Sequence, residues 1–182
     1  MIRVRPAQLT DVPPIWEHLR RHGNESGRNG DLIFAPYEEP WSRPLDELQK
    51  EKETKWSRPV TEIGWERCWV LGDKENIYGE LKLAHAIGLK TSLHRALLMM
   101  GIERPHRGNG MGKLLMEEAI GWARKQPTLD WIQLNVFAHN EPAKRLYQNF
   151  GFEKVGVNRD LFRVCGQKID DIEMVLPLRT LS

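Results

Sequence analysis

The sequence predicts one mixed α/β domain spanning residues 1–182. Short segments that alternate apolar and polar residues are typical of strands, and they occur near both ends of the chain. Apolar stripes at helical spacing lie between them, and no linker, internal repeat or low-complexity tract divides the chain. A chain of 182 residues is long enough to bury a substantial core without disulfides or metals.

The first third of the chain predicts a strand, a helix and a less regular region. Residues 2–5 alternate as a short strand does, and Thr10 or Asp11 can cap the helix that follows. Residues 22–65 are interrupted by glycines and prolines, with one helix expected over 46–56. The apolar stripe of the first helix consists of Val12, Ile15, Trp16 and Leu19.

The remainder predicts strands and helices in alternation. The expected strands cover residues 68–71, 77–83, 95–102, 132–136, 154–165 and 168–178. Turns are expected at 72–76 and at Gly166-Gln167. The expected helices cover 111–122, before Pro127, and 143–150, ending at Gly151, because glycine commonly follows the last turn of a helix.

Composition favours an ordinary soluble protein in the cytoplasm. The formal net charge is only +2 and the basic residues are scattered, so we expect no nucleic-acid partner. No segment approaches the ~20 apolar residues of a membrane span, and the amino terminus lacks a signal-peptide core. Cys68 and Cys165 form no CxxC pair and are expected to be reduced, partly buried thiols. The histidines show no HExxH or paired-ligand spacing, so no metal is expected.

The most informative segment is glycine-rich and lies between an apolar strand and an amphipathic helix. It consists of Arg107, Gly108, Asn109, Gly110, Met111, Gly112 and Lys113. Glycines let backbone amides approach a ligand, and amides that open a helix attract phosphate oxygens. Arg107 and Lys113 add positive charge. The segment therefore predicts a pyrophosphate site, although a lone glycine cluster can also be a strand-to-helix turn without a ligand.

Two common phosphate motifs do not fit this segment. A Walker A loop needs Ser or Thr after Gly-Lys to hold magnesium, and Leu114 stands there. A GxGxxG dinucleotide motif that begins at Gly108 needs a third glycine where Lys113 stands. A nucleotide-binding or nucleic-acid-binding domain is thus disfavoured.

Two segments in order resemble the GNAT family of N-acetyltransferases. The strand Met99-Met100-Gly101-Ile102 followed by the glycine segment is similar to the family's strand and Arg/Gln-x-x-Gly-x-Gly/Ala loop. Residues 134–143, with Leu146-Tyr147 and residues 150–152, look like its strand, Asn, helix, Leu-Tyr and Gly-Phe block. The resemblance covers about residues 67–178 and is weaker at the first strand and helix. It implies a central, mostly antiparallel sheet of about six to seven strands, flanked by helices and with splayed middle strands.

The resemblance also implies a site for acetyl-CoA, the acyl donor. Backbone groups of Met100, Gly101 and Ile102 would bond the pantetheine arm, and the amides from Arg107 to Lys113 would hold the pyrophosphate. Asn140 matches an asparagine that contacts coenzyme A. It is also suited to cap the helix that begins at Glu141 and Pro142, and we expect it to do both.

Tyr147 matches the family's general acid, which protonates the departing thiolate. Spacing alone fits a tyrosine that simply packs on the helical stripe with Ala143 and Leu146. The base stays unassigned, because Ala96 and Asn135 stand where family members carry a glutamate. The remaining candidates for the base are Glu80, His85, Glu103 and a water molecule.

The expected reaction is direct transfer of an acetyl group to a primary amine in a ternary complex. The amine belongs to a small molecule or to a peptide or protein, and residues 22–65 would shape its pocket. The acidic pairs Glu38-Glu39 and Asp46-Glu47 are candidates for receiving it, or are solvated loop residues. The alternative is a non-catalytic acyl-CoA-binding sensor of the same fold. Family members often dimerise, which leaves a homodimer open.

Overall fold

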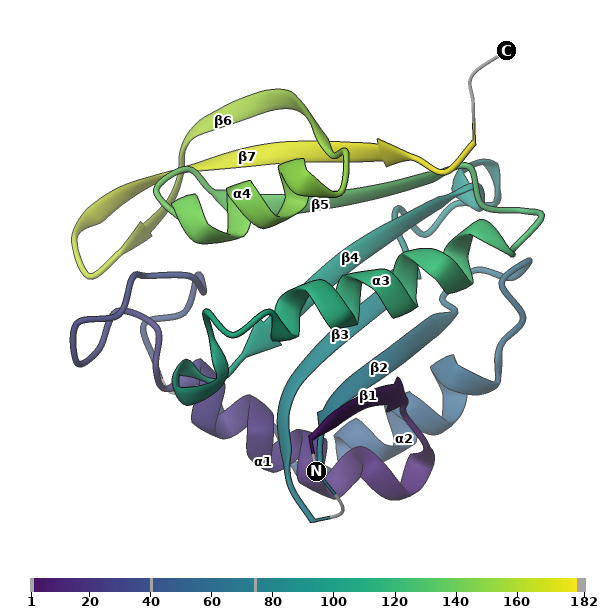
Figure 1. Cartoon of the computed structure of the whole chain (residues 1–182), viewed down its shortest axis with the longest axis horizontal. Helices are drawn as coiled ribbons and strands as arrows, with labels where there is room; N and C mark the ends of the chain where they lie inside the picture. The colour runs from purple at the N-terminus through teal and green to yellow at the C-terminus, as the bar shows by residue number, and fades with distance from the viewer. Residues whose placement is uncertain (1, 40, 74, 180–182) are drawn as a thin grey trace.

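Seven strands form one sheet in the part of the chain that the computed structural model describes, residues 2–39, 41–73 and 75–179. The strand order is β1-β2-β3-β4-β5-β7-β6 (Figure 1). All neighbouring strands run antiparallel except β4 and β5, which run parallel. The expected mostly antiparallel sheet, flanked by helices, is therefore confirmed.

The helices and strands match those expected from the sequence, with small shifts at their ends. The strands are β1 (Arg3–Pro6), β2 (Glu66–Gly72), β3 (Ile77–His85), β4 (Arg95–Ile102), β5 (Trp131–Phe137), β6 (Glu153–Val164) and β7 (Gln167–Pro177). The α-helices are α1 (Val12–Gly23), α2 (Leu45–Ser57), α3 (Met111–Arg124) and α4 (Glu141–Asn149). The turn predicted at 72–76 joins β2 to β3, and its Lys74 lies outside the described residues.

The last hairpin turns one residue earlier than predicted. Cys165 and Gly166 occupy the turn, with φ angles of 50° and 74°. Positive φ at both central residues matches the twist of the flanking strands, which is why this two-residue turn closes the β6–β7 hairpin. Cys165 is consequently exposed, whereas Cys68 on β2 is buried, so the expectation that both thiols are partly buried is wrong. Both thiols are free.

Asp11 joins the first strand to the first helix through an ion pair with Arg5 and not as a helix cap. It occupies the position before α1, but its carboxylate does not cap that helix. Its two oxygens accept hydrogen bonds from the Arg5 guanidinium at 2.6 and 2.7 Å, and one also accepts from the Gln8 amide at 2.7 Å. The ion pair holds β1 against the start of α1.

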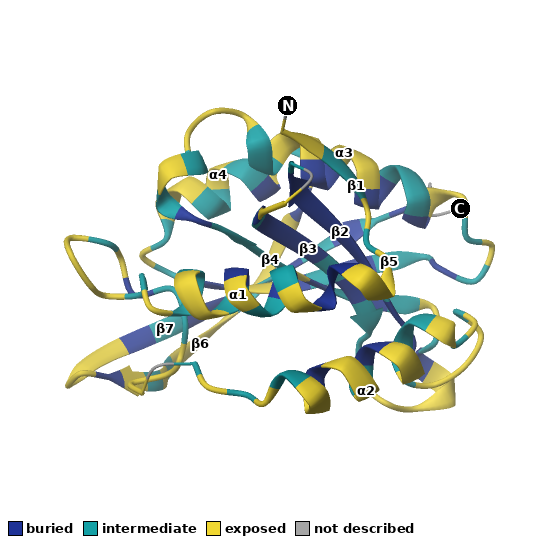
Figure 2. Cartoon of the chain, turned by 90° about the horizontal axis from the view of Figure 1, so that it is seen from below, coloured by how far each residue is buried: buried dark blue, intermediate teal, exposed yellow. Residues whose placement is uncertain are grey.

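One face of the sheet buries mainly apolar side chains, whereas the other also buries charged side chains. In Figure 1, α3 lies over β2 to β4 and α4 lies over β5 and β7, and this face carries the main apolar core. Figure 2 shows α1 and α2 across the opposite face. Two smaller apolar clusters among the described residues are separate from the main core. One is made of Ile15, Cys68, Val70 and Ile77, and the other of Ile33, Phe137, Val164 and Ile169.

Charged groups fill much of the remaining space beneath α1 and α2. Lys52 of α2 reaches Glu66 of β2 at 2.5 Å, and both residues are 3% exposed. His18 of α1 contacts Glu103, just after β4, with 2.9 Å between Nδ1 and Oε1. A buried charge costs several kcal/mol unless it is paired, which explains the pairing.

Candidate active site

β4 and β5 separate after a short parallel contact. Only three residues of each strand pair, Arg95 to Leu97 with Trp131 to Gln133. β4 continues to Ile102 along β3, and β5 continues to Phe137 along β7 (Figure 1). The facing edges of both strands are thus left without a strand partner beyond the contact, which confirms the splayed middle strands.

The register of β3 and β4 determines which backbone groups face the opening. The Glu103 amide donates to the Tyr78 carbonyl at 2.9 Å. In an antiparallel pair every second residue bonds its partner, so the backbone groups of Gly101 point to Glu80 on β3. Those of Met100 and Ile102 point away from β3, toward the opening. Among the described residues, Met100 therefore presents a free amide and a free carbonyl there. Ile102 presents only its amide, because its carbonyl accepts a hydrogen bond from Arg107 Nε at 2.7 Å.

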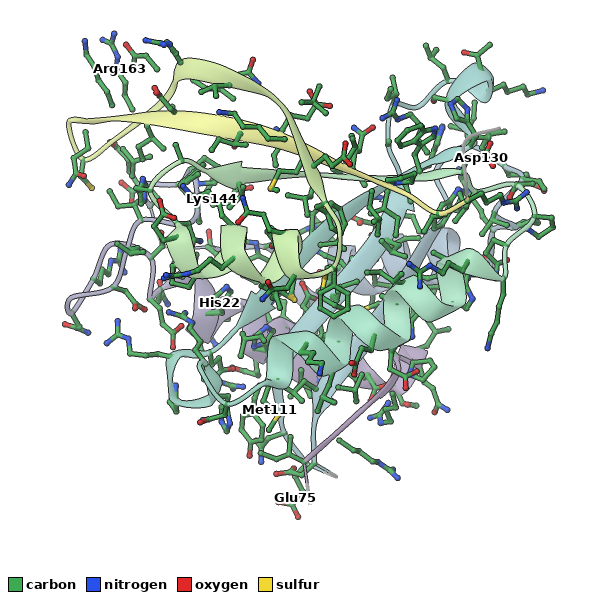
Figure 3. The ribbon with its side chains drawn as sticks, turned by 45° about the horizontal axis from the view of Figure 1, so that its top comes forward. His22, Glu75, Met111, Asp130, Lys144 and Arg163 are labelled. Atoms are coloured by element: carbon green, nitrogen blue, oxygen red, sulfur yellow. The ribbon has the colours of Figure 1, made fainter. Side chains whose placement is uncertain are left out.

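The glycine segment forms a tight loop that leads into α3. Gly108 and Gly110 both have φ of 77°, in the left-handed region, and a Cβ atom at either position would meet nothing within 4 Å. The amides from Gly108 to Lys113 find no acceptor among the described residues. Met111 begins α3, so these amides surround the positive end of a helix dipole (Figure 3). The loop is an open anion-binding arrangement.

Arg107 points away from these amides. Its Nε donates to the Ile102 carbonyl at 2.7 Å, and its terminal nitrogens bond Asp31, at 2.8 Å, and Glu25. The guanidinium also lies 5.0 Å from the centre of the Phe34 ring. We expected Arg107 to add positive charge to the phosphate site, but its charge is neutralised by two carboxylates. Its backbone amide also donates to the Arg104 carbonyl, at 3.2 Å.

Gly112 brings the loop, β4 and α4 together. A Cβ atom at this position would lie 3.0 Å from Cδ2 of Leu146 on α4 and 3.5 Å from Cδ1 of Ile102 on β4. Any larger residue would push α4 away from the start of α3. The glycine therefore serves close packing, whereas Gly108 and Gly110 serve a left-handed backbone.

Tyr147 lies on the buried face of α4. The residue is 7% exposed, and its ring packs against Phe152 with 5.8 Å between ring centres. Its hydroxyl makes no hydrogen bond with the described residues. The hydroxyl is not fully buried, so part of its surface stays accessible. Burial raises the pKa of Tyr147 to about 12. The phenol is therefore protonated at neutral pH, as a general acid must be.

Asn140 caps α4. Its side-chain oxygen accepts a hydrogen bond from the Ala143 amide at 3.3 Å, which confirms the expected capping role. Pro142 stands in the first turn of the helix, where a missing amide hydrogen costs nothing. The contact with coenzyme A stays a prediction.

The candidates for the base each have another partner. Glu80 is 4% exposed and pairs with Lys82 at 3.3 Å. Burial would raise the pKa of Glu103, but hydrogen bonds from His18 and Arg21 hold it below its usual range. His85 lies at the far end of β3, beside the paired part of β4, with its Nε2 3.0 Å from the Ser92 hydroxyl.

The acidic pairs that were candidates for receiving the amine, or for being solvated loop residues, are spread over the surface. A Glu38 oxygen accepts from the Cys165 amide at 2.8 Å, which ties residues 31–39 to the β6–β7 hairpin. Asp46 and Glu47 lie in the first turn of α2, where Asp46 pairs with Lys50 at 3.6 Å. No contact among the described residues brings the two pairs together.

A hollow of about 350 Å³ lies between α1 and residues 41–44. Trp16 crosses it and donates from its indole nitrogen to the Arg43 carbonyl at 2.6 Å. The walls are Trp16, Arg20, Trp41, Ser42, Arg43 and Pro44. The expectation that residues 22–65 shape the acceptor pocket stays a prediction.

Two contacts on the α1 side were not expected from the sequence. The His22 ring covers Gly101, where a Cβ atom would lie 2.6 Å from His22 Cδ2. Burial, followed by the charges of His18 and Arg107, lowers the pKa of His22 to about 4. Asn135, on the freed part of β5, donates to Asp171 of β7 at 2.5 Å. The sequence contains one signal for Asp171. Apolar and polar residues alternate along β7, and this alternation places Asp171 on the face of the sheet away from the main core.

The described residues offer neither a metal site nor a membrane-spanning helix. No cluster of three or more His, Cys, Asp or Glu residues suited to a metal occurs among the described residues. None of the helices described is long and apolar enough to cross a membrane.

The arrangement agrees with comparisons to known proteins. The family model "Acetyltransferase (GNAT) family" matches residues 30–152. N-alpha-acetyltransferase RimI of Mycobacterium tuberculosis is 33% identical over 67 residues, which are 37% of this chain and only 40% of that relative.

Two solved structures share the whole fold. A GNAT acetyltransferase from Streptococcus pneumoniae has a TM-score of 0.81 at 22% identity, covering 97% of this chain and 99% of that one. YncA of Salmonella typhimurium, solved with its cofactor acetyl-CoA, has a TM-score of 0.82 at 15% identity, covering 100% of this chain and 96% of that one. Because the family model matches well over half of its residues, the chain belongs to the GNAT acetyltransferase family.

Proposed function

We propose that this protein transfers an acetyl group from acetyl-CoA to a primary amine by direct transfer in a ternary complex. The observation that carries the proposal is the opening between β4 and β5, which has free backbone groups on one edge and the glycine loop at its end. Acetyl-CoA supplies the activated acyl group. The acceptor is a small molecule, or a peptide or protein with a free amine.

The residues present fit the donor. The free amides from Gly108 to Lys113 would hold its pyrophosphate, and backbone groups of Met100 and Ile102 would bond the pantetheine arm. Side-chain-free space above Gly108 and Gly110 leaves room for phosphate oxygens. Gly101 contributes differently, because its backbone is engaged by β3 and its missing side chain makes room for His22.

Tyr147 would donate the proton that the departing thiolate needs. Its raised pKa keeps the proton on the phenol until the sulfur departs. The free groups on β4 would polarise the carbonyl that is attacked, as an oxyanion hole does. No side chain on this face is required to form a covalent bond, so positioning contributes much of the acceleration.

Three experiments test the proposal. Calorimetric titration with acetyl-CoA should give saturable one-to-one binding. Thiol release with a panel of polyamines, amino acid amides and short peptides should identify acceptors. Initial rates with the best acceptor should give intersecting double-reciprocal lines, whereas parallel lines and an acetylated enzyme in the mass spectrum would refute direct transfer. Binding without thiol release from any amine would favour the acyl-CoA-binding sensor.

We place the protein in the cytoplasm. Cys68 and Cys165 support this location, because both are free thiols, as a reducing compartment maintains them. Labelling of Cys165, the exposed thiol, in intact cells without prior reduction would test this.

A further inference from the structure

One carboxylate on the charged face of the sheet lacks a counter-ion. Five acidic residues are buried among those described, and ion pairs engage Asp11, Glu66, Glu80 and Glu103. The fifth, Asp171 of β7, is 2% exposed and has no cation within salt-bridge distance among the described residues. A buried charge left without a partner costs several kcal/mol, so its retention calls for a reason.

Asp171 is held in one orientation by a neutral group. The Asn135 amide nitrogen donates to its Oδ2 at 2.5 Å, across the β5–β7 pair. Its Oδ1 makes no hydrogen bond with the described residues. This oxygen is not fully buried, so part of its surface stays accessible. One oxygen is thus fixed and the other is free to accept a proton.

The pair lies beside the opening between β4 and β5, on the side away from α3. Ile132, Leu134 and Val136 of β5 pack in the main core, so Asn135 points to the opposite face, where it is exposed. Ile172 and Met174 of β7 place Asp171 on that same face. Across the opening, Met99 of β4 is 38% exposed, because Leu98 and Met100 turn to the core. On this side Phe137 packs with Ile33 at the end of β5, and the His22 ring covers Gly101 near the end of β4. The exposed positions that flank the opening between these contacts are Met99 and Asn135.

The surroundings of Asp171 favour a cation. Glu173 follows on the same face of β7, directly opposite Asn135 in the register. Phe137 and Asn158 stand opposite Asp171 on β5 and β6, and neither carries a charge. Burial raises the pKa of Asp171, the bond from Asn135 opposes this, and the charge of Glu173 raises it further. A carboxyl whose pKa is closer to neutrality is a better base.

We propose that Asp171, held by Asn135, is the carboxylate that receives the ammonium group of the acceptor and removes its proton. The inference rests on the proposed acetyl transfer and supplies its missing base.

The protons balance as follows. One ammonium proton passes to Oδ1 of Asp171 and from there to solvent. The nitrogen lone pair then forms a bond to the thioester carbon, and the carbon–sulfur bond breaks. The thiolate takes the proton of Tyr147, and a second proton leaves the nitrogen and restores the phenol through solvent. The products are the amide, the thiol and one released proton.

The test compares two variants on the same strand and the same face. Asp171→Asn should lower kcat/KM for the best amine of the panel about 10²–10⁴-fold, the range of general-base catalysis. The matched control Glu173→Gln should change it less than about tenfold. The Kd for acetyl-CoA should stay within about twofold of wild type in both. Since Asp171→Asn removes an unpaired buried charge, its Tm should not fall.

A double-mutant cycle tests the role of Asn135 as a positioning residue. Asn135→Ala should lower kcat/KM for the amine in the wild-type background and have little further effect in Asp171→Asn. Equal losses in both backgrounds would mean that Asn135 acts independently of Asp171.

The failures are distinguishable. If wild type releases thiol with no amine, the proposed function falls and the inference with it. If wild type is active and Asp171→Asn is equally active, only the inference falls. Equal losses in Asp171→Asn and Glu173→Gln would overturn the assignment to Asp171, and so would a fall in Tm with an unchanged kcat/KM.

Discussion

Substituting Gly110 by alanine should separate the stability of the glycine loop from its use as an anion site. Gly110 has φ of 77°, and Gly88, in the loop after β3, has φ of 73°. A Cβ atom meets nothing within 4 Å at either position. The two glycines therefore match in backbone conformation and free space, and only Gly110 lies beside the unbonded amides at the start of α3.

The magnitudes follow from this match. Placing alanine in the left-handed region costs about 1–2 kcal/mol. In a chain of this length each 1 kcal/mol lowers Tm by about 2–4 °C. In Gly110→Ala the new methyl also occupies space that a phosphate would use. Losing one charge-assisted hydrogen bond costs about 1.5–3 kcal/mol, which raises Kd about 10-fold to 150-fold.

Thermal unfolding and calorimetric titration with acetyl-CoA measure the two effects. We expect Gly88→Ala and Gly110→Ala to lose similar Tm, and only Gly110→Ala to weaken acetyl-CoA binding at a temperature where both are folded. If both variants bind acetyl-CoA as tightly as wild type, the loop is a strand-to-helix turn and the phosphate assignment is wrong.

Three further predictions concern single groups. Tyr147→Phe should lower kcat about 10²–10⁴-fold and leave the Kd for acetyl-CoA unchanged. Its Tm should also be unchanged, because the hydroxyl bonds no described residue. An unchanged kcat in steady-state assays would remove Tyr147 from the mechanism. His22 has its pKa lowered from 6.5 to about 4, so below pH 6.5 the unfolded chain binds a proton that the folded chain refuses. The free energy of unfolding should therefore fall by up to about 3 kcal/mol as the pH drops from 6.5 to 4, and urea unfolding of His22→Gln should lack this component. Lys52→Met should lower the free energy of unfolding by about 3–5 kcal/mol, because it leaves Glu66 buried without its cation. Lys52→Met combined with Glu66→Leu should recover most of this loss in urea unfolding. A small loss in the single variant would mean that Glu66 reaches solvent.

Local sequence patterns were sufficient for the elements of the fold and for the glycine loop. Periodicity predicted each helix and strand because apolar spacing reflects which face is buried. Gly108 and Gly110 could be placed because a left-handed backbone strongly favours glycine. The splayed strands came from the resemblance alone, since no local pattern marks where two paired strands separate.

Contacts between distant segments could not be read from the sequence. Arg107 looked like a phosphate ligand because it adjoins the glycines, but its partners Glu25 and Asp31 belong to a loop that precedes α2. Asp171 was overlooked for a related reason. Asp171 stands out because it has no counter-ion among the described residues. The absence of a counter-ion can be recognised only when the residues that face Asp171 on the neighbouring strands are known.

The raised pKa of Tyr147 constrains how the two sides of the sheet must cooperate. A phenol of pKa about 12 is a weaker acid than an ordinary thiol of pKa about 8.5, so moving its proton to a free thiolate is uphill by about 5 kcal/mol. The transfer is completed only if the phenolate regains a proton at once. In the proposed mechanism the attacking nitrogen would supply that proton, because it becomes strongly acidic as its bond to the carbonyl carbon forms. Tyr147 would then relay one proton from nitrogen to sulfur, and a single carboxylate would suffice for the other. Asp171 is suited to that one task, since no counter-ion among the described residues competes for its charge.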